Sequence, residues 1–221
     1  MENVKSKRSA RGKAAATGSG QEEKIRERNE RQILEAATVL FSRKGFQGTR
    51  TSEIAEAAGL PKANVYYYFS SKEQIYSAVI RHLIAGWDDA LQQIRADREP
   101  AEALEAYVRA KLDYAWHNKE ESRMFATEIL AGAPFLSRRD REHMRDVTKE
   151  RSEIIEHWIR QGKLKPVDPR HLFIILWSST QFYADFDKLA CDALETTRLT
   201  AADLETAAQT IVQTVIGSLL K

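Results

Sequence analysis

A short run of hydrogen-bonding side chains between residues 62 and 67 is suited to contact with nucleic-acid bases. Lys62 can donate to the O6 and N7 atoms of guanine, and Asn64 can form paired hydrogen bonds with adenine. The small Ala63 lets a backbone come close and can touch a thymine methyl group. Tyr66 and Tyr67 are expected to point outward and donate their hydroxyls to phosphate. The run therefore predicts a surface that reads double-stranded DNA.

Phosphate contacts are expected on both sides of this run. Lys72 begins the next predicted helix, where its charge adds to the unpaired N–H groups of a helix N-terminus. Thr51 and Ser52 begin the preceding helix and can donate in the same way, and Arg50 lies directly before them. Such contacts hold a protein in register on the duplex but carry no sequence information.

Two short helices joined by a glycine turn are needed to position these residues. Small Ala55 permits close approach of two helices, and Gly59 permits the positive φ of a tight turn. Leu60 and Val65 can fill the small core between the helices. A short helix, a three- or four-residue turn with glycine and a second short helix over about 62–68 together predict a DNA-reading helix-turn-helix.

A longer helix precedes this pair. Apolar residues recur at three- and four-residue steps from about residue 24 to Gly45, which can end the helix as a left-handed residue. Thr49, Thr51 and Ser52 offer hydroxyl caps to the next helix. Tyr68, at the end of the helix-turn-helix, is expected to pack inward.

A second group of polar residues interrupts the mostly apolar helix predicted over residues 169–189. Trp177 can stack on a flat ring. Gln181 carries one donor group and one acceptor group, which match the imide edge of a pyrimidine. Together with Tyr183 and Asp185, these residues predict one wall of a ligand pocket.

Other interpretations of this group remain open. Glu128 can face the same space from another helix, or it can be a solvated or paired carboxylate. Gln181 and Asp185 can instead be polar residues of an interface between subunits. Three aromatic residues elsewhere are expected in the core rather than in a ligand wall: Trp87, Tyr114 and Phe125.

The remainder of the chain has helical periodicity and no strand with two-residue alternation. Asp168 before Pro169 is typical of an N-cap followed by proline at the first helical position. Helices are predicted at about residues 71–96, 100–117, 120–131, 138–161, 169–189 and 201–219. The fold class is therefore all-α.

Three parts are predicted along the chain. Residues 1–22 form a flexible basic arm, which is either a passive tail or a contact to DNA. Residues 23–70 form an N-terminal three-helix helix-turn-helix domain. Residues 71–221 form a C-terminal helical domain for ligand binding and dimerisation.

The last predicted helix suggests how two subunits pair. Its apolar residues recur at helical spacing, and small residues on it allow close helix approach. Packed with helix 169–189 and their symmetry mates, it predicts a four-helix interface in a homodimer. The apolar residues are Leu204, Ala208, Ile211, Val215 and Leu219.

Composition narrows the class of protein. The chain has 221 residues and a net charge of +2, with the excess of basic residues in its first 80 residues, which suits a polyanionic partner. A single cysteine, Cys191, excludes an internal disulfide and fits a reducing compartment. No export signal and no apolar run long enough to span a membrane is present. We therefore expect a soluble, cytoplasmic protein with no membrane partner.

Enzyme chemistry finds no support in the sequence. The five histidines show no HExxH motif and no other metal-ligand spacing. There is no glycine-rich phosphate loop and no GxSxG elbow. We expect neither a catalytic site nor a metal or cofactor.

The N-terminal motifs resemble those of the TetR family of bacterial repressors. They are FSRKGFQGTRT (residues 41–51), IAEAAG (54–59) and VYYYFSSKE (65–73). The resemblance covers about residues 30–76 without a gap. It implies a homodimer with an N-terminal DNA-binding unit and a C-terminal ligand-sensing domain. Pro61 departs from the family, which more often has a hydroxyl residue there that can cap the recognition helix.

Four C-terminal segments resemble one subgroup of the family, the uracil-responsive regulators of pyrimidine utilisation. They are EILAGAP (128–134), GKL (162–164), VDPRHL (167–172) and WSSTQFYADF (177–186). Phe182 stands where that subgroup has a histidine. The resemblance implies that the ligand is a small molecule such as uracil or a related nucleobase.

The sequence thus predicts a DNA-binding transcriptional regulator. We expect a homodimeric repressor that binds an inverted-repeat operator and is released by a small-molecule effector. The alternative is an architectural DNA-binding protein with a helical dimer body and no ligand. Loss of operator binding on addition of a ligand would distinguish the two.

Overall fold

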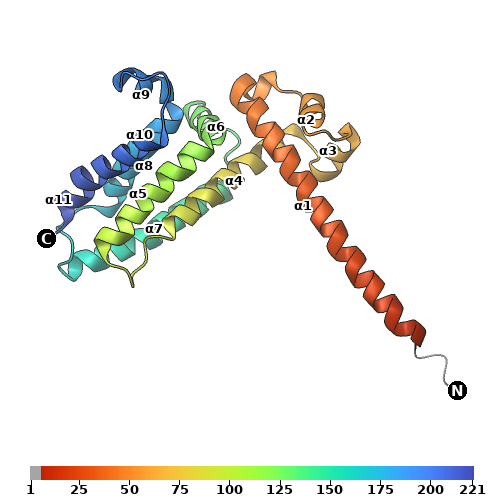
Figure 1. Ribbon diagram of the computed structural model, residues 1–221, viewed down its shortest axis with the longest axis horizontal. Coiled ribbons are helices and arrows are strands. Elements are labelled where there is room, and N and C mark those ends of the chain that lie inside the picture. Colours follow the sequence, from red (N-terminus) through yellow and green to blue (C-terminus); the bar gives the residue numbers. More distant parts are fainter. Residues whose placement is uncertain (1–5) are drawn as a thin grey trace. The chain divides into compact units, whose positions relative to one another are not determined.

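The chain folds into helices throughout the part that the structure describes (Figure 1). The computed structural model describes the backbone of residues 6–221 and the side chains of residues 21–221. Within these residues there is no β-strand, and only an isolated bridge joins Leu164 to Leu220. The prediction of an all-α fold is confirmed. Among the described helices, none is both long and apolar enough to cross a membrane.

The chain divides into two compact units, residues 1–76 and 77–221. The division falls inside one helix, α4 (Lys72–Leu91), whose first turn belongs to the first unit. Tyr76 explains this assignment, because its ring meets Phe41 edge to face at 4.9 Å and Phe46 at 5.2 Å. The sequence placed the boundary a few residues earlier, after residue 70.

The first unit consists of α1 (Ser6–Gly48), α2 (Thr51–Ala57), α3 (Lys62–Tyr68) and the start of α4. Its core is formed by completely or almost completely buried apolar side chains. Two glycines turn the chain with positive φ as expected, Gly45 at 67° and Gly59 at 66°. The core side chains are Ile33, Ala37, Phe41, Ile54 and Val65.

The start of α1 differs from the prediction. The sequence placed a flexible arm over residues 1–22 and began the helix near residue 24. Residues 1–5 of that arm lie outside the described residues, and the backbone is helical from Ser6 onward. Alanine, lysine, arginine and glutamate are frequent between residues 7 and 28, and all are strong helix formers.

The hydroxyl caps expected for α2 are not formed. Thr49 is buried, and its hydroxyl donates to the carbonyls of Leu40 and Gly45 at the end of α1. The backbone N–H of Arg50 instead donates to the Glu53 carboxylate at 2.9 Å. The Glu53 carboxylate in the first turn therefore satisfies the backbone N–H of the N-cap residue, which is one half of a capping box.

The second unit contains the remaining helices, in which α5 packs against α8 at the centre (Figure 1). Trp158, Tyr107 and Phe173 are the largest completely buried side chains there. The elements after α4 are α5 (Pro100–His117), α6 (Lys119–Leu130), α7 (Arg138–Arg160), α8 (Pro169–Asp185), α9 (Asp187–Ala193), α10 (Ala201–Ile211), the π-helical turn η1 (Val212–Ile216) and α11 (Gly217–Leu219).

Two predicted helices end earlier than expected. α4 stops at Leu91, because the turn that follows buries Ile94 completely. α8 stops at Asp185, and Phe186 leaves the helical conformation. Arg123 stabilises this break, since it donates to the carbonyl of Ala184 and pairs with Asp187 at 2.7 Å.

The apolar stripe of the last helix packs largely within its own protomer. Ala208 and Ile211 are buried inside their own protomer. Leu204, Val215 and Leu219 pack against the same core. These side chains therefore stabilise the subunit itself and do not form its outer face.

Candidate DNA and ligand sites

The predicted base-reading residues lie on the outside of the second helix of the helix-turn-helix. Lys62, Ala63 and Asn64 are exposed in the first turn of α3, while Val65 is completely buried against the first unit's core. No side-chain hydrogen bond or ion pair within the described residues engages Lys62 or Asn64. Their polar groups are therefore available for base edges.

As expected, two of the three tyrosines of α3 are exposed and the third packs inward. Tyr66 and Tyr67 are 46% and 76% exposed, and the Lys62 ammonium lies 5.6 Å from the Tyr66 ring centre. Tyr68 is half-buried, and its hydroxyl accepts a hydrogen bond from Asn29 of α1 at 3.1 Å. Tyr68 thus fixes α3 to α1, while its two neighbours are free to contact DNA.

Lys72 has structural partners that the sequence did not reveal. Its ammonium donates to the carbonyl oxygens of Phe46 at 2.7 Å and Thr49 at 3.0 Å, and it lies 4.2 Å from the Phe46 ring centre. One of its three N–H groups is left for a phosphate. At the start of α2, Arg50 and Ser52 are exposed and Thr51 is partly exposed.

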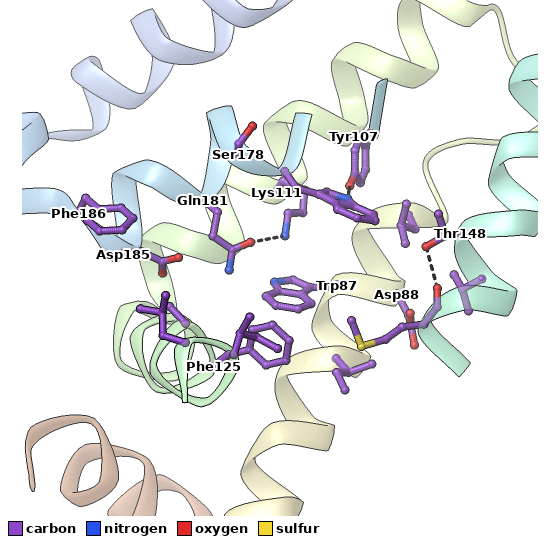
Figure 2. A pocket seen from close by; sticks show the side chains of 18 residues that line it. Trp87, Asp88, Tyr107, Lys111, Phe125, Thr148, Ser178, Gln181, Asp185 and Phe186 are labelled. Atoms are coloured by element: carbon purple, nitrogen blue, oxygen red, sulfur yellow. Dashed lines mark hydrogen bonds between the residues drawn. The ribbon is translucent and has the colours of Figure 1, made fainter. Parts of the chain in front are cut away.

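A cavity of about 400 Å³ lies among α4, α5, α6, α7 and α8 of the second unit (Figure 2). Trp87 forms much of one wall, and its ring meets Phe125 edge to face at 4.7 Å. Trp177 forms another, and its indole N–H donates to the Tyr107 hydroxyl at 2.8 Å. Two indole rings on different helices thus border one space.

The polar groups of the cavity form a chain from α5 to α8. The Lys111 ammonium donates to Gln181 Oε1 at 3.3 Å, and Gln181 Nε2 donates to the Ser122 hydroxyl at 3.0 Å. That hydroxyl in turn donates to the Asp185 carboxylate. Figure 2 shows Lys111, Gln181 and Asp185 together on one side of Trp87.

Burial shifts the pKa values of the two ionisable groups in this series of hydrogen bonds. Lys111 is only 3% exposed, and desolvation lowers the pKa of its ammonium to about 7, although the nearby Asp185 opposes the shift. The ammonium also lies 4.4 Å from the Trp87 ring centre, which favours its charged form. Burial raises the pKa of the Asp185 carboxyl, while Ser122 and two cations act in the other direction. Lys111 therefore titrates close to neutral pH.

Comparison with known proteins decides the family. Residues 33–79 match the family described as bacterial regulatory proteins, tetR family, and residues 80–221 match the C-terminal region of YcdC-like proteins. The chain belongs to the TetR family. Its relatives are transcriptional regulators rather than enzymes, and this TetR-family chain is a helix-turn-helix transcriptional regulator.

Individual relatives agree with this assignment. The chain is 44% identical over 154 residues to the HTH-type transcriptional regulator RutR of Escherichia coli (strain K12), which covers 70% of this chain and 73% of the relative. It is 30% identical to the HTH-type transcriptional repressor NicS of Pseudomonas putida, over 68% of this chain and 73% of the relative.

Solved structures share the TetR fold. AibR in complex with isovaleryl coenzyme A and operator DNA aligns with a TM-score of 0.64 at 24% identity, over 85% of this chain and 97% of that one. A tetR-family regulatory protein from Rhodococcus RHA1 aligns with a TM-score of 0.68 at 21% identity, over 86% and 96% of the two chains. At these identities the likeness shows the fold alone.

The TetR-family structure brings together three of the five residues predicted for the ligand. Trp177, Gln181 and Asp185 line the cavity, whereas Tyr183 and Glu128 do not. Tyr183 lies on another face of α8 and packs against the hydrophobic core. Glu128 is 2% exposed, and its carboxylate accepts the backbone N–H groups of the loop before α7 at 2.6 and 3.1 Å. Glu128 is thus a paired carboxylate, the alternative that the sequence left open, and Tyr183 lies outside the lining.

Sequence reasoning missed other residues of the cavity. Trp87 and Phe125 were expected in the core, yet both line the space. Lys111 was not singled out, although the apolar stripe of α5 passes through its position, between Val108 and Ala115. A lysine on a buried stripe is the signal that could have found it. Phe182, the departure from the uracil-responsive subgroup, is outside the lining and partly exposed.

Among the residues with described side chains, no group of three or more histidine, cysteine, aspartate or glutamate residues could hold a metal ion. Cys191 is a free, partly exposed thiol.

Proposed function

We propose that this regulator is a homodimeric repressor that binds an inverted-repeat operator and is released by a small molecule, a pyrimidine base such as uracil. It acts in the cytoplasm on chromosomal DNA. The observation that carries the proposal is the hydrogen bond between the buried Lys111 and the partly buried Gln181, beside two indole rings.

The hydrogen-bonding capacity of this pair supports a flat ligand with alternating carbonyl and N–H groups. An ammonium has three donors, and Lys111 uses one of them on Gln181. The Gln181 amide retains one donor and one acceptor beyond its bonds to Lys111 and Ser122. A pyrimidine imide edge offers acceptors to the two donors and an N–H to the acceptor. Trp87 and Trp177 supply flat apolar surface for the ring.

The exposed residues of the helix-turn-helix support operator binding. We assign base contacts to Lys62, Ala63 and Asn64, whose side chains form no hydrogen bond or ion pair within the described residues. Phosphate contacts are assigned to Tyr66, Tyr67, Lys72, Arg50, Thr51 and Ser52.

Release requires that the effector bind a conformation that does not fit the operator. α4 is the element suited to couple the two events, because it begins at Lys72 and carries Trp87 and Asp88 of the cavity wall. A ligand that moves Trp87 shifts this helix. Coupling between two sites is typically about 1–3 kcal/mol, or about 5–150-fold in affinity.

The test compares operator affinity with and without uracil, using an operator selected from random DNA by the purified protein. Uracil is expected to weaken binding of the unmodified protein and to have no effect on Gln181→Ala, which still binds the operator. Tyr183→Phe is the matched control on the same helix and should respond normally. Operator binding by the unmodified protein that no nucleobase changes would favour the architectural alternative.

A further inference from the structure

The size of the cavity and the distribution of its polar groups bear on the identity of the effector. Even at the roughly 30 Å³ that each water occupies in the liquid, the eight non-hydrogen atoms of a pyrimidine base fill about 240 Å³. The cavity holds about 400 Å³. A free base therefore leaves a large part of the space without a partner.

The remaining space is apolar in character. The α4–α6–α7 side of the cavity is lined mainly by aliphatic side chains. Space left unfilled against these side chains forfeits dispersion contacts, and the space opens to solvent at Ile129 and Leu130, which are 45% and 85% exposed. The side chains are Ile84, Leu91, Ile129, Leu130, Met144 and Val147.

The polar residues on that side are already engaged. Asp88 accepts from His143 at 2.6 Å, and the Thr148 hydroxyl donates to the carbonyl of Met144 at 2.7 Å. Figure 2 shows Asp88 and Thr148 across Trp87 from Gln181. A polar extension of the ligand would meet mainly apolar side chains there, with only the spare acceptor sites of Asp88 and Thr148 as partners, whereas a hydrocarbon would bury apolar surface.

We infer that the effector is a substituted pyrimidine base, with its imide edge on Lys111 and Gln181 and a short hydrocarbon arm against the α4–α6–α7 side of the cavity. This inference rests on the proposed function and narrows its ligand class. The arm supplies binding free energy by burial, while the ring supplies orientation. An effector of this class binds more tightly than uracil itself.

The experiment measures dissociation constants by calorimetry for uracil and for uracils with n-alkyl groups, from methyl to butyl, at ring position 5 or 6. At one of the two positions the dissociation constant is expected to fall about fourfold per methylene, which is the usual gain on burying a CH₂ group. The gain ends when the chain fills the cavity.

Two kinds of variant locate the arm. Val147→Phe fills the aliphatic side and is expected to abolish the gain per methylene; Ile129→Phe repeats the test from α6 in case the first variant does not fold. Gln181→Ala is expected to raise the dissociation constants of uracil and of every alkyl uracil by the same factor. The gain in affinity per methylene should therefore stay unchanged. A gain that persists unchanged in both filling variants would overturn the placement of the arm.

Failure of this inference differs from failure of the proposed function. If uracil binds and releases the operator while neither alkyl series binds more tightly, the effector is the free base and the inference is wrong. If neither uracil nor any alkyl uracil binds, the pyrimidine ligand of the proposed function is wrong and the inference falls with it.

Discussion

At the scale of single residues, Asn64 offers a direct test of base reading. Its side chain is exposed in the first turn of α3 and has no partner among the described residues. Asn64→Ala is expected to cost about 1–3 kcal/mol of operator affinity and to relax selectivity at one or two base pairs. The measurement is binding to the operator and to its single-base variants at fixed salt. Unchanged affinity and selectivity would show that α3 does not read bases in the DNA groove.

Lys72 needs a different interpretation from Asn64, because its ammonium holds two backbone carbonyls. Lys72→Met is expected to weaken binding to all DNA sequences alike and also to lower the melting temperature. A lower melting temperature with unchanged DNA affinity would show that the residue serves the fold alone.

Lys111 predicts a pH-dependent stability. Its folded pKa of about 7 lies below the usual 10.5, so the unfolded chain binds more protons between these values and stability rises with pH. Over the full window the shift corresponds to roughly 5 kcal/mol, of which most is gained between pH 7 and 9.5. Lys111→Met keeps the aliphatic stem and should lack this rise.

The measurement is urea unfolding of both proteins at several pH values in that interval. Taking the difference between the two proteins cancels the titration of other groups. Parallel stability curves would mean that the Lys111 ammonium keeps its ordinary pKa in the folded state.

At the scale of elements, the sequence predicted most of the helices, because their ends are marked locally. Gly45, Gly59 and the Asp168–Pro169 cap act through neighbouring backbone: Gly45 interrupts the helical conformation near the end of α1, Gly59 follows α2, and the cap begins α8. The break after Asp185 could not be predicted in this way. It depends on Arg123, which is more than 60 residues away in the chain.

The ligand site shows the same limit. Trp177, Gln181 and Asp185 lie on one face of one helix, and their spacing was readable. Lys111 and Trp87 come from two other helices, and periodicity cannot distinguish a residue that lines a cavity from one that fills a core. Whether such a residue lines a cavity or fills the core depends on the side chains that face it from the other helices.

The contact between α4 and α5 gives an element-scale prediction at Gly86. A methyl group there would lie 2.1 Å from a ring carbon of Tyr114. Glycine to alanine in a helix ordinarily stabilises by about 1 kcal/mol, but overpacking costs about 1–3 kcal/mol. Gly86→Ala is therefore expected to destabilise the protein in thermal or urea unfolding. In a Tyr114→Leu background the same change should be neutral or stabilising, and a gain of stability without that second change would contradict the contact.

At the scale of the whole molecule, one apolar face of the second unit has no cover within the protomer. It follows α8 into α9, and its side chains are between 38% and 56% exposed. Exposed apolar side chains grouped on neighbouring elements are typical of an interface. Its members are Ile174, Ile175, Phe182, Phe186 and Leu189.

We therefore place the proposed dimer interface on this face, and Ile175→Glu tests it. The glutamate is solvated in a monomer, whereas a two-fold interface would bury it twice without a partner. We expect a folded monomer by sedimentation equilibrium and, because two linked recognition helices bind together, an operator affinity lower by about 10²–10⁴-fold.

Two control variants accompany this test. Gln92→Glu changes an exposed residue in the turn after α4, and the protein should stay dimeric. Ile211→Glu should unfold the subunit, since Ile211 is 6% exposed inside the core. A dimer that survives Ile175→Glu with full operator affinity would place the interface on another face.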